Sequence, residues 1–165
     1  MVFSLAALGF HIEAARGQTP DRVANPQFSR ERGFYDASFD VTITCDTPGA
    51  TIYYSLDGSE PCDGSGLSPT GRVYAAPLRI TKTTCLRAQA ICDGRPPSDL
   101  VTHTYVFLSD VIACSQGQVL AQGYPDAWFG GQPADYEMDP EICFGSAYAD
   151  SIRDALLAIP TVSLV

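Results

Sequence analysis

Short stretches of alternating apolar and polar residues recur through the middle of the chain, and this pattern constrains the fold more than any other feature. In residues 39–45 (FDVTITC) every second side chain is apolar, and residues 51–56 (TIYYSL) alternate in the same way. Such alternation, rich in β-branched residues, is typical of strands with one buried face. The turn residues Asp46-Thr47-Pro48-Gly49 lie between the two segments. Together they predict a hairpin or a corner between two sheets.

Further strands follow at intervals of about ten residues, separated by segments rich in Gly, Pro, Asp and Ser. We expect them at residues 72–74, 78–81, 84–92 and 101–107, with a seventh near residues 27–29. No helical period appears between residues 27 and 107, which argues against alternating strands and helices. The sequence therefore predicts a mainly β fold, an antiparallel β-sandwich of immunoglobulin-like or fibronectin-like topology.

The same region resembles a known family. The most specific element is residues 50–61 (ATIYYSLDGSEP), and residues 33–36, 77–80, 83–88 and 97–98 add to it. Over residues 27–107 the chain resembles the chitobiase/β-hexosaminidase carboxy-terminal domain family. The resemblance implies a small immunoglobulin-like sandwich that is a non-catalytic accessory module of larger, usually exported, bacterial proteins. The chain departs from the family pattern at four cysteines, which are Cys45, Cys62, Cys85 and Cys92.

Charge is unevenly distributed between two regions. Residues 1–107 hold eleven acidic and nine basic residues, a net charge of −2, whereas residues 108–165 hold eight acidic residues and only Arg153, a net charge of −7. Such a shift marks a change of structural unit. We expect an N-terminal remnant or linker at 1–26, a sandwich at 27–107 and an acidic connector at 108–165. The acidic balance also argues against nucleic acid and anionic membranes as partners.

The acidic connector is expected to be a mostly irregular extension with one short amphipathic helix. Ser146 can cap this helix, which would run over residues 146–158 and stop at Pro160. An apolar strand at residues 161–165 would follow, and we favour truncation of the chain after it. Residues 108–165 are similar to the connector that precedes CotH-like kinase domains in bacterial surface proteins. That resemblance implies one piece of a longer architecture, with adjacent domains of the same polypeptide as partners.

The amino terminus leaves two alternatives open. Residues 2–10 (VFSLAALGF) are apolar and could be a degenerate secretory signal or the remnant of an upstream strand. Residues 19–26 are interpreted as a linker because two prolines oppose regular structure. No run approaches the roughly 20 apolar residues needed to span a bilayer. We expect an extracellular or cell-surface location, because the resemblance implies export and the cysteines are compatible with an oxidising compartment.

The six cysteines admit fifteen disulfide pairings. One pair can be argued from topology. Cys45 and Cys92 would each lie at the end of a strand, on its core face, and both at the same end of the sandwich. We hypothesise a Cys45–Cys92 bridge, and the alternative is buried thiols that act as small hydrophobes. The cysteine spacing does not match a zinc site, so we expect no metal and no cofactor.

No catalytic residues are expected, because neither His11 nor His103 has a supporting nucleophile motif. Tyr53 and Trp128 are the candidates for ligand binding, since exposed aromatic side chains can stack on sugar rings. The alternatives are a cross-strand neighbour for Tyr53 and a packing plug for Trp128. We therefore predict a non-enzymatic β-sandwich accessory module that spaces or orients neighbouring domains. The other interpretations are a carbohydrate-binding module, with polysaccharide as partner, and a fragment leading into a CotH-like kinase domain.

Overall fold

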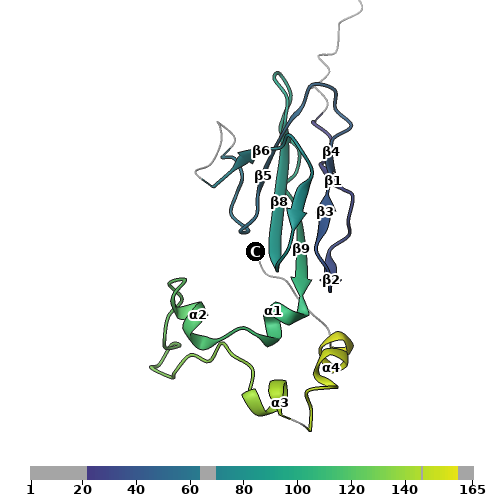
Figure 1. The fold of residues 1–165 in the computed structure, drawn as a ribbon. Helices are drawn as coiled ribbons and strands as arrows, with labels where there is room; N and C mark the ends of the chain where they lie inside the picture. The colour runs from purple at the N-terminus through teal and green to yellow at the C-terminus, as the bar shows by residue number, and fades with distance from the viewer. Residues whose placement is uncertain (1–21, 64–69, 146, 160–165) are drawn as a thin grey trace, which may run out of the picture.

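The structure is a computed structural model that describes residues 22–63, 70–145 and 147–159. Figure 1 shows two stacked β layers with short helices gathered below them. The first layer is a five-stranded sheet in the order β2-β9-β8-β5-β6. Its strands are β2 (Gly33–Tyr35), β9 (Val101–Phe107), β8 (Thr84–Ile91), β5 (Thr51–Ser55) and β6 (Arg72–Val73). The predicted β-sandwich is thus confirmed.

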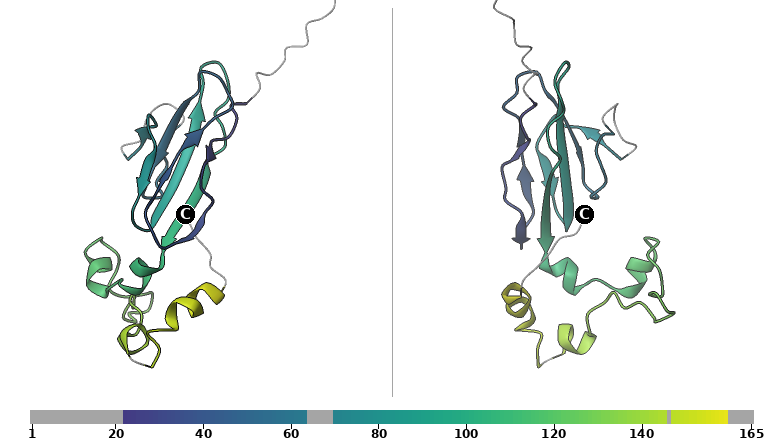
Figure 2. Two further views of the ribbon diagram at one scale, coloured as in Figure 1. Left: turned by 45° about the vertical axis from the view of Figure 1, so that its right-hand side comes forward. Right: turned by 180° about the vertical axis from the view of Figure 1, so that it is seen from behind.

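The second layer consists of two strand pairs, and Figure 2 shows it lying against the first layer. The pairs are β1 (Gln27–Phe28) with β4 (Ile43–Thr44), and β3 (Phe39–Val41) with β7 (Leu78–Ile80). The sequence predicted β3 and β4 as one strand. It is divided at Thr42, whose backbone N–H and carbonyl bond to Ser29, because the chain changes its partner there from β7 to β1.

The turn after β4 is a corner that joins the two layers, one of the two alternatives that the sequence left open. Ala50 N–H donates to the Thr47 carbonyl at 3.3 Å, with Pro48 and Gly49 between them. Gly49 has φ +76°, which is the left-handed backbone that the third position of a type II turn requires. The chain then continues directly into β5.

The core lies between the layers and comes from alternate residues of the strands, as the period-two pattern predicts. Its buried members are Phe39, Val41, Ile43, Tyr54, Ile80, Leu86, Ala88, Tyr105 and Phe107. Aromatic rings dominate one end, where Phe39 lies 5.2 Å from Tyr105 and 6.2 Å from Phe107 between ring centroids. One pairing departs from the antiparallel expectation, because the unpredicted strand β2 runs parallel to β9.

The extension beyond β9 is more helical than predicted. It contains α1 (Leu108–Ile112), α2 (Gln116–Leu120), α3 (Pro140–Phe144) and α4 (Ile152–Ala158). Only α4 was expected, and it starts at Ile152 rather than near residue 146. The other three are five residues long, which is too short to reveal a helical period. Two of them nevertheless have caps of residue types that favour a helix start. Ser115 and Gln118 form a capping box at α2, and Asp139 caps α3 ahead of Pro140.

Several predicted segments fall outside the described residues. They are the apolar N-terminal stretch at 2–10, the expected helix cap Ser146, and Pro160 with the strand at 161–165. No helix in the part of the chain that the structure describes is long and apolar enough to cross a membrane.

Candidate functional site

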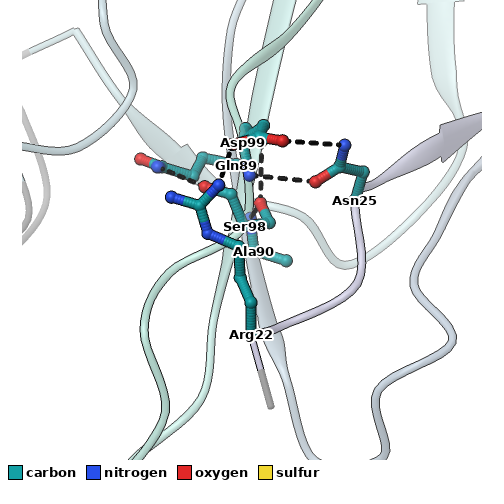
Figure 3. Close-up of polar contacts among 6 residues, drawn as sticks. All are labelled: Arg22, Asn25, Gln89, Ala90, Ser98 and Asp99. Carbon is teal, nitrogen blue, oxygen red and sulfur yellow. Dashed lines mark hydrogen bonds and ion pairs between the residues drawn. The ribbon is translucent and has the colours of Figure 1, made fainter. Parts of the chain in front are cut away.

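A polar network holds the N-terminal segment against one end of the sandwich (Figure 3). Its centre is Ser98, which is 1% exposed, and its neighbour Asp99. The Ser98 hydroxyl accepts from the Ala90 N–H at 2.8 Å and donates to the Asp99 carbonyl at 2.8 Å. The Gln89 side-chain amide donates to the Ser98 carbonyl at 2.8 Å. The segment before β9 is therefore fixed to the end of β8 by buried hydrogen bonds.

Asp99 extends this network to the N-terminal segment. Its carboxylate forms an ion pair with Arg22 and accepts from the Asn25 side-chain amide at 3.4 Å, while its backbone N–H donates to the Asn25 side chain at 2.9 Å. Val23, 2% exposed, donates its N–H to the Pro96 carbonyl at 3.1 Å. We call residues 22–25 with 96–99 the N-terminal clamp. Residues 22–26 were interpreted as a linker, but they pack on the sandwich because a buried valine and paired side chains hold them.

Contacts at the opposite end of β8 and β9 fix the extension. The Asp110 carboxylate of α1 accepts from the Thr83 N–H at 2.6 Å, and the Thr83 hydroxyl accepts from the Phe107 N–H at 3.0 Å. Arg153 of α4 forms an ion pair with Asp36, which follows β2. We call these contacts the C-terminal clamp. Thr84 lies opposite Tyr105 and Ala88 opposite Val101, so the two clamps lie at opposite ends of the strands.

Residues 124–136 of the extension form a structured loop that we call the aromatic hairpin. The Ala134 N–H donates to the Asp126 carbonyl at 2.9 Å, and the Trp128 N–H donates to the Gln132 carbonyl at 2.7 Å. The tip is a turn in which the Gly131 N–H donates to the Trp128 carbonyl at 3.1 Å. Gly130 has φ +87° at the third turn position, where glycine is favoured. This turn leaves Phe129 fully exposed.

Three rings of the hairpin pack in a row that we call the aromatic row. Tyr136 lies in the middle, with its ring centroid 5.1 Å from Trp128 and 6.0 Å from Tyr124. The Tyr136 hydroxyl donates to the Pro125 carbonyl at 2.9 Å, and its N–H donates to the Gln116 side chain of α2 at 2.9 Å. Trp128 and Tyr124 nevertheless keep 49% and 57% of their surface exposed. Trp128 is therefore an exposed member of a packed cluster rather than a plug against the sandwich.

The structure places Tyr53 elsewhere. Tyr53 is half-buried on β5, where it lies opposite Val73 of β6 and Gln89 of β8. These positions are the cross-strand neighbours that the alternative interpretation of Tyr53 expected. Tyr53 belongs to the sandwich and Trp128 to the extension, so the two ligand-binding candidates lie on different parts of the fold.

The structure does not contain the hypothesised Cys45–Cys92 disulfide, because both residues are free thiols. The Cys45 sulfur is 3.2 Å from the Ala24 carbonyl oxygen, to which it donates. The N-terminal clamp thus covers the end of β4, where the sequence placed only a linker. Cys92 lies beyond the end of β8 and is half-buried rather than part of the core.

Titratable groups in the sandwich serve local structure. Burial raises the pKa of Tyr105, whose hydroxyl donates to the Arg30 carbonyl at 3.1 Å. His103 contacts the same carbonyl oxygen at 3.1 Å, and its ring lies 4.6 Å from Phe28. Hydrogen bonds from the Ser59 side chain and backbone hold the pKa of Asp57 below its usual value, so the Asp57 carboxylate stabilises a local turn. None of these contacts pairs a nucleophile with a base.

Metal ligands do not gather in the described ranges, where no group of three or more His, Cys, Asp or Glu side chains could hold an ion. The alternating acids of residues 135–141 are used locally instead. Asp135 accepts from the Glu137 N–H at 3.2 Å, Asp139 from the Glu141 N–H at 2.8 Å, and Glu137 from the Gln116 N–H at 2.9 Å.

Fold and contacts together define an immunoglobulin-like β-sandwich module whose polar groups hold the chain at its two ends. Comparison with protein families agrees, because residues 31–102 match the chitobiase/beta-hexosaminidase C-terminal domain. This segment is similar to a non-catalytic accessory domain of larger glycosidases, and the first resemblance drawn from the sequence is confirmed for it. A search of curated proteins and a search of solved structures each found no match. None of these findings supports the resemblance of residues 108–165 to a CotH connector.

Sequence reasoning missed both clamps. It noted Ser98 only as part of a resemblance, and it assigned Arg22 and Asn25 to a linker. A buried valine at position 23 between polar residues was the available signal, but a single apolar residue is weak against two neighbouring prolines. The aromatic row was also missed as a group, because Tyr124 and Tyr136 approach Trp128 only through the hairpin.

Proposed function

We propose that this chain is a non-catalytic accessory module of a larger exported protein and that its sandwich holds neighbouring segments in fixed orientation. The observation that carries the proposal is the pair of clamps at opposite ends of β8 and β9. The chain enters the sandwich at the N-terminal clamp and leaves it at the C-terminal clamp. Hydrogen bonds and ion pairs hold the chain at both of these junctions. The family match supports the accessory role.

Each junction combines backbone and side-chain contacts, which distinguishes it from a flexible linker. At the first, the buried Val23 and the Asp99 interactions act together. At the second, β9 continues into α1 without an intervening loop, and Leu108 is 3% exposed. Rotation at either junction would break several contacts at once. We therefore divide the chain into a sandwich that starts at the N-terminal clamp and an extension that starts at Leu108.

Distance measurements between two genetically encoded spin labels test the proposal. Labels at Arg95, beside the N-terminal clamp, and at Gln122, in the extension, avoid the native cysteines. We expect one narrow distance distribution in the wild-type chain. Asp110→Ala, which removes the acceptor for Thr83 N–H, should broaden it, whereas Asp150→Ala, an exposed acid of the same extension, should not. A broad wild-type distribution would contradict a spacing role.

Hydrogen exchange tests the N-terminal clamp separately. The Val23 amide donates to Pro96, so we expect slow exchange in the wild-type chain and fast exchange in Asp99→Ala. Asp40→Ala is a matched control, because it removes an exposed ion pair with Arg79 away from the clamp. Rapid wild-type exchange at Val23 would show that residues 22–25 are a linker after all.

Export is tested by locating the natural full-length protein in cell fractions, and a cytoplasmic location would contradict it.

A second candidate function, carbohydrate binding, is favoured by one observation, the aromatic row, in which Tyr124 and Trp128 are exposed on either side of the half-buried Tyr136. Aromatic faces stack on the apolar C–H faces of sugars. Retention of the chain on insoluble polysaccharides tests this candidate, and the absence of retention on all of them would remove it. A CotH-like kinase neighbour stays a prediction, which the reading frame beyond residue 165 would test.

A further inference from the structure

The aromatic row is a preformed surface rather than a set of loose side chains. Its backbone is fixed by the hairpin hydrogen bonds, and Gln116 of α2 bonds both the Ala134 carbonyl, at 2.7 Å, and the Tyr136 N–H. The middle ring is anchored through its hydroxyl on Pro125. A ligand that contacts the row therefore has little ordering cost to overcome.

The electrostatic surroundings of the row are strongly one-sided. Asp126, Asp135 and Glu137 are exposed and lie within or next to the hairpin. Arg153 is the one basic residue among the described residues from 108 onwards, and it is paired with Asp36. The field at the row is thus negative, which attracts cations and repels anionic polymers.

We propose that the aromatic row binds a polysaccharide whose sugar units carry protonated amino groups. The inference rests on the second candidate function and specifies its ligand class. Sugar rings would stack on Trp128 and Tyr124, and the ammonium groups would be attracted by the ring faces and by the carboxylates of Asp126 and Asp135. A neutral polysaccharide would gain only the stacking. A basic peptide has the charge but no flat ring with apolar C–H faces.

Retention of the full-length chain on cross-linked chitosan beads, which stay insoluble when their amines are protonated, tests the proposal. Chitin and cellulose serve as neutral matrices, and a polylysine resin serves as the basic peptide. We expect the strongest retention on chitosan under acidic conditions that protonate its amines, and weaker retention as salt is raised. Trp128→Ala and Tyr124→Ala should each weaken it about fivefold. Tyr148→Ala is the matched control, because Tyr148 is also 57% exposed in the extension but lies outside the row.

A second variant keeps the test independent of ring packing. Asp126→Asn preserves the shape of the side chain, and we expect it to weaken retention on chitosan and to reduce its dependence on salt. Hydrogen exchange at the Trp128 and Ala134 amides would establish that each variant keeps the hairpin.

Each remaining outcome overturns the proposal in a distinguishable way. Equal retention on chitin and chitosan would overturn the preference for amino groups but leave carbohydrate binding standing. Equal retention on polylysine would assign the surface to basic peptides. Retention on chitosan that Trp128→Ala leaves unchanged would move the site away from the row. No retention on any polysaccharide would remove both the ligand class and the carbohydrate-binding candidate, while the spacing role is judged by the distance measurements.

Discussion

The sandwich and the extension differ in how many of their large apolar side chains they bury. The sandwich buries a continuous core, and among its described residues only Phe34 and Val73 are large hydrophobic side chains left exposed. The described part of the extension buries little beyond Leu108, Ala134, Cys143 and Ile152. It exposes a larger set, which is Tyr124, Trp128, Phe129, Ile142, Phe144, Tyr148, Leu157 and Ile159.

This difference teaches where the stability of the chain resides. Burial of apolar surface is the main favourable term in folding, so the sandwich can hold its own structure. The extension relies on short capped helices, hairpin hydrogen bonds and its attachment at the C-terminal clamp. We infer that the extension loses its structure whenever the sandwich unfolds, but that parts of it can open while the sandwich stays folded. Its exposed side chains are available for contacts.

The largest expected effect compares one leucine from each region. Leu86 is fully buried in β8, and Leu86→Ala should lower the free energy of unfolding by about 2–5 kcal/mol. Leu157→Ala deletes the same atoms from a side chain that is 50% exposed in α4, and should change it by less than about 0.5 kcal/mol. Chemical denaturation of both variants measures the difference. Equal losses would break the comparison.

Ser98→Ala should have the next largest effect. It leaves the Ala90 N–H without the hydroxyl that it bonds at 2.8 Å inside the sandwich, which costs about 1–3 kcal/mol. The exposed Ser109 of α1 provides the control, and Ser109→Ala should be close to neutral. Thermal unfolding compares the two, and an unchanged melting temperature for Ser98→Ala would show that the buried network contributes little.

A change in the extension should have a smaller and more local effect. Ser115→Ala removes the side-chain acceptor of the α2 capping box and should destabilise this helix by about 1 kcal/mol. Because α2 does not contribute to the sandwich core, we expect faster amide exchange at Gln118 without a shift in the unfolding of β8. A matching loss of protection in β8 would mean that the two regions unfold as one unit.

The smallest effect concerns acid. Hydrogen bonds from Ser59 lower the pKa of Asp57 in the folded chain, so its ionised form stabilises the fold above the unfolded pKa near 3.8. This contribution is lost as the pH falls through that value and below. Asp57→Asn should therefore lose less stability than the wild-type chain between pH 5 and 3. Asp126→Asn in the hairpin is the comparison variant, and we expect its loss of stability to match that of the wild-type chain. Parallel acid denaturation curves for wild type and Asp57→Asn would contradict the assignment.

The contrast also explains how much of the structure the sequence could predict. Strands β5, β8 and β9 could be predicted because a strand with one buried face has an apolar residue at every second position. Leu86, Ala88 and Ala90 of β8 show this alternation. The division at Thr42 and the parallel strand β2 were not visible, since partner changes leave no periodic trace. In the extension, local caps rather than periodicity determine the helices.

The candidate site could be predicted less well from the sequence, for a related reason. Trp128 could be singled out as an aromatic residue beside Gly130 and Gly131, but its neighbours in the row come from the other parts of the hairpin. The Cys45–Cys92 hypothesis placed both sulfurs on the core face at the end of a strand, whereas Cys45 donates to the Ala24 carbonyl and Cys92 lies half-buried beyond β8. Residues 22–25 cover the end of β4, and their interaction with Asp99 spans 74 or more positions of sequence.

The two outer strands of the five-stranded sheet have a consequence for assembly. The sheet ends at β6, with two residues, and at β2, with three. A strand of another molecule could therefore pair with only two or three residues of β6 or of β2, which limits edge-to-edge growth of the sheet at these two strands.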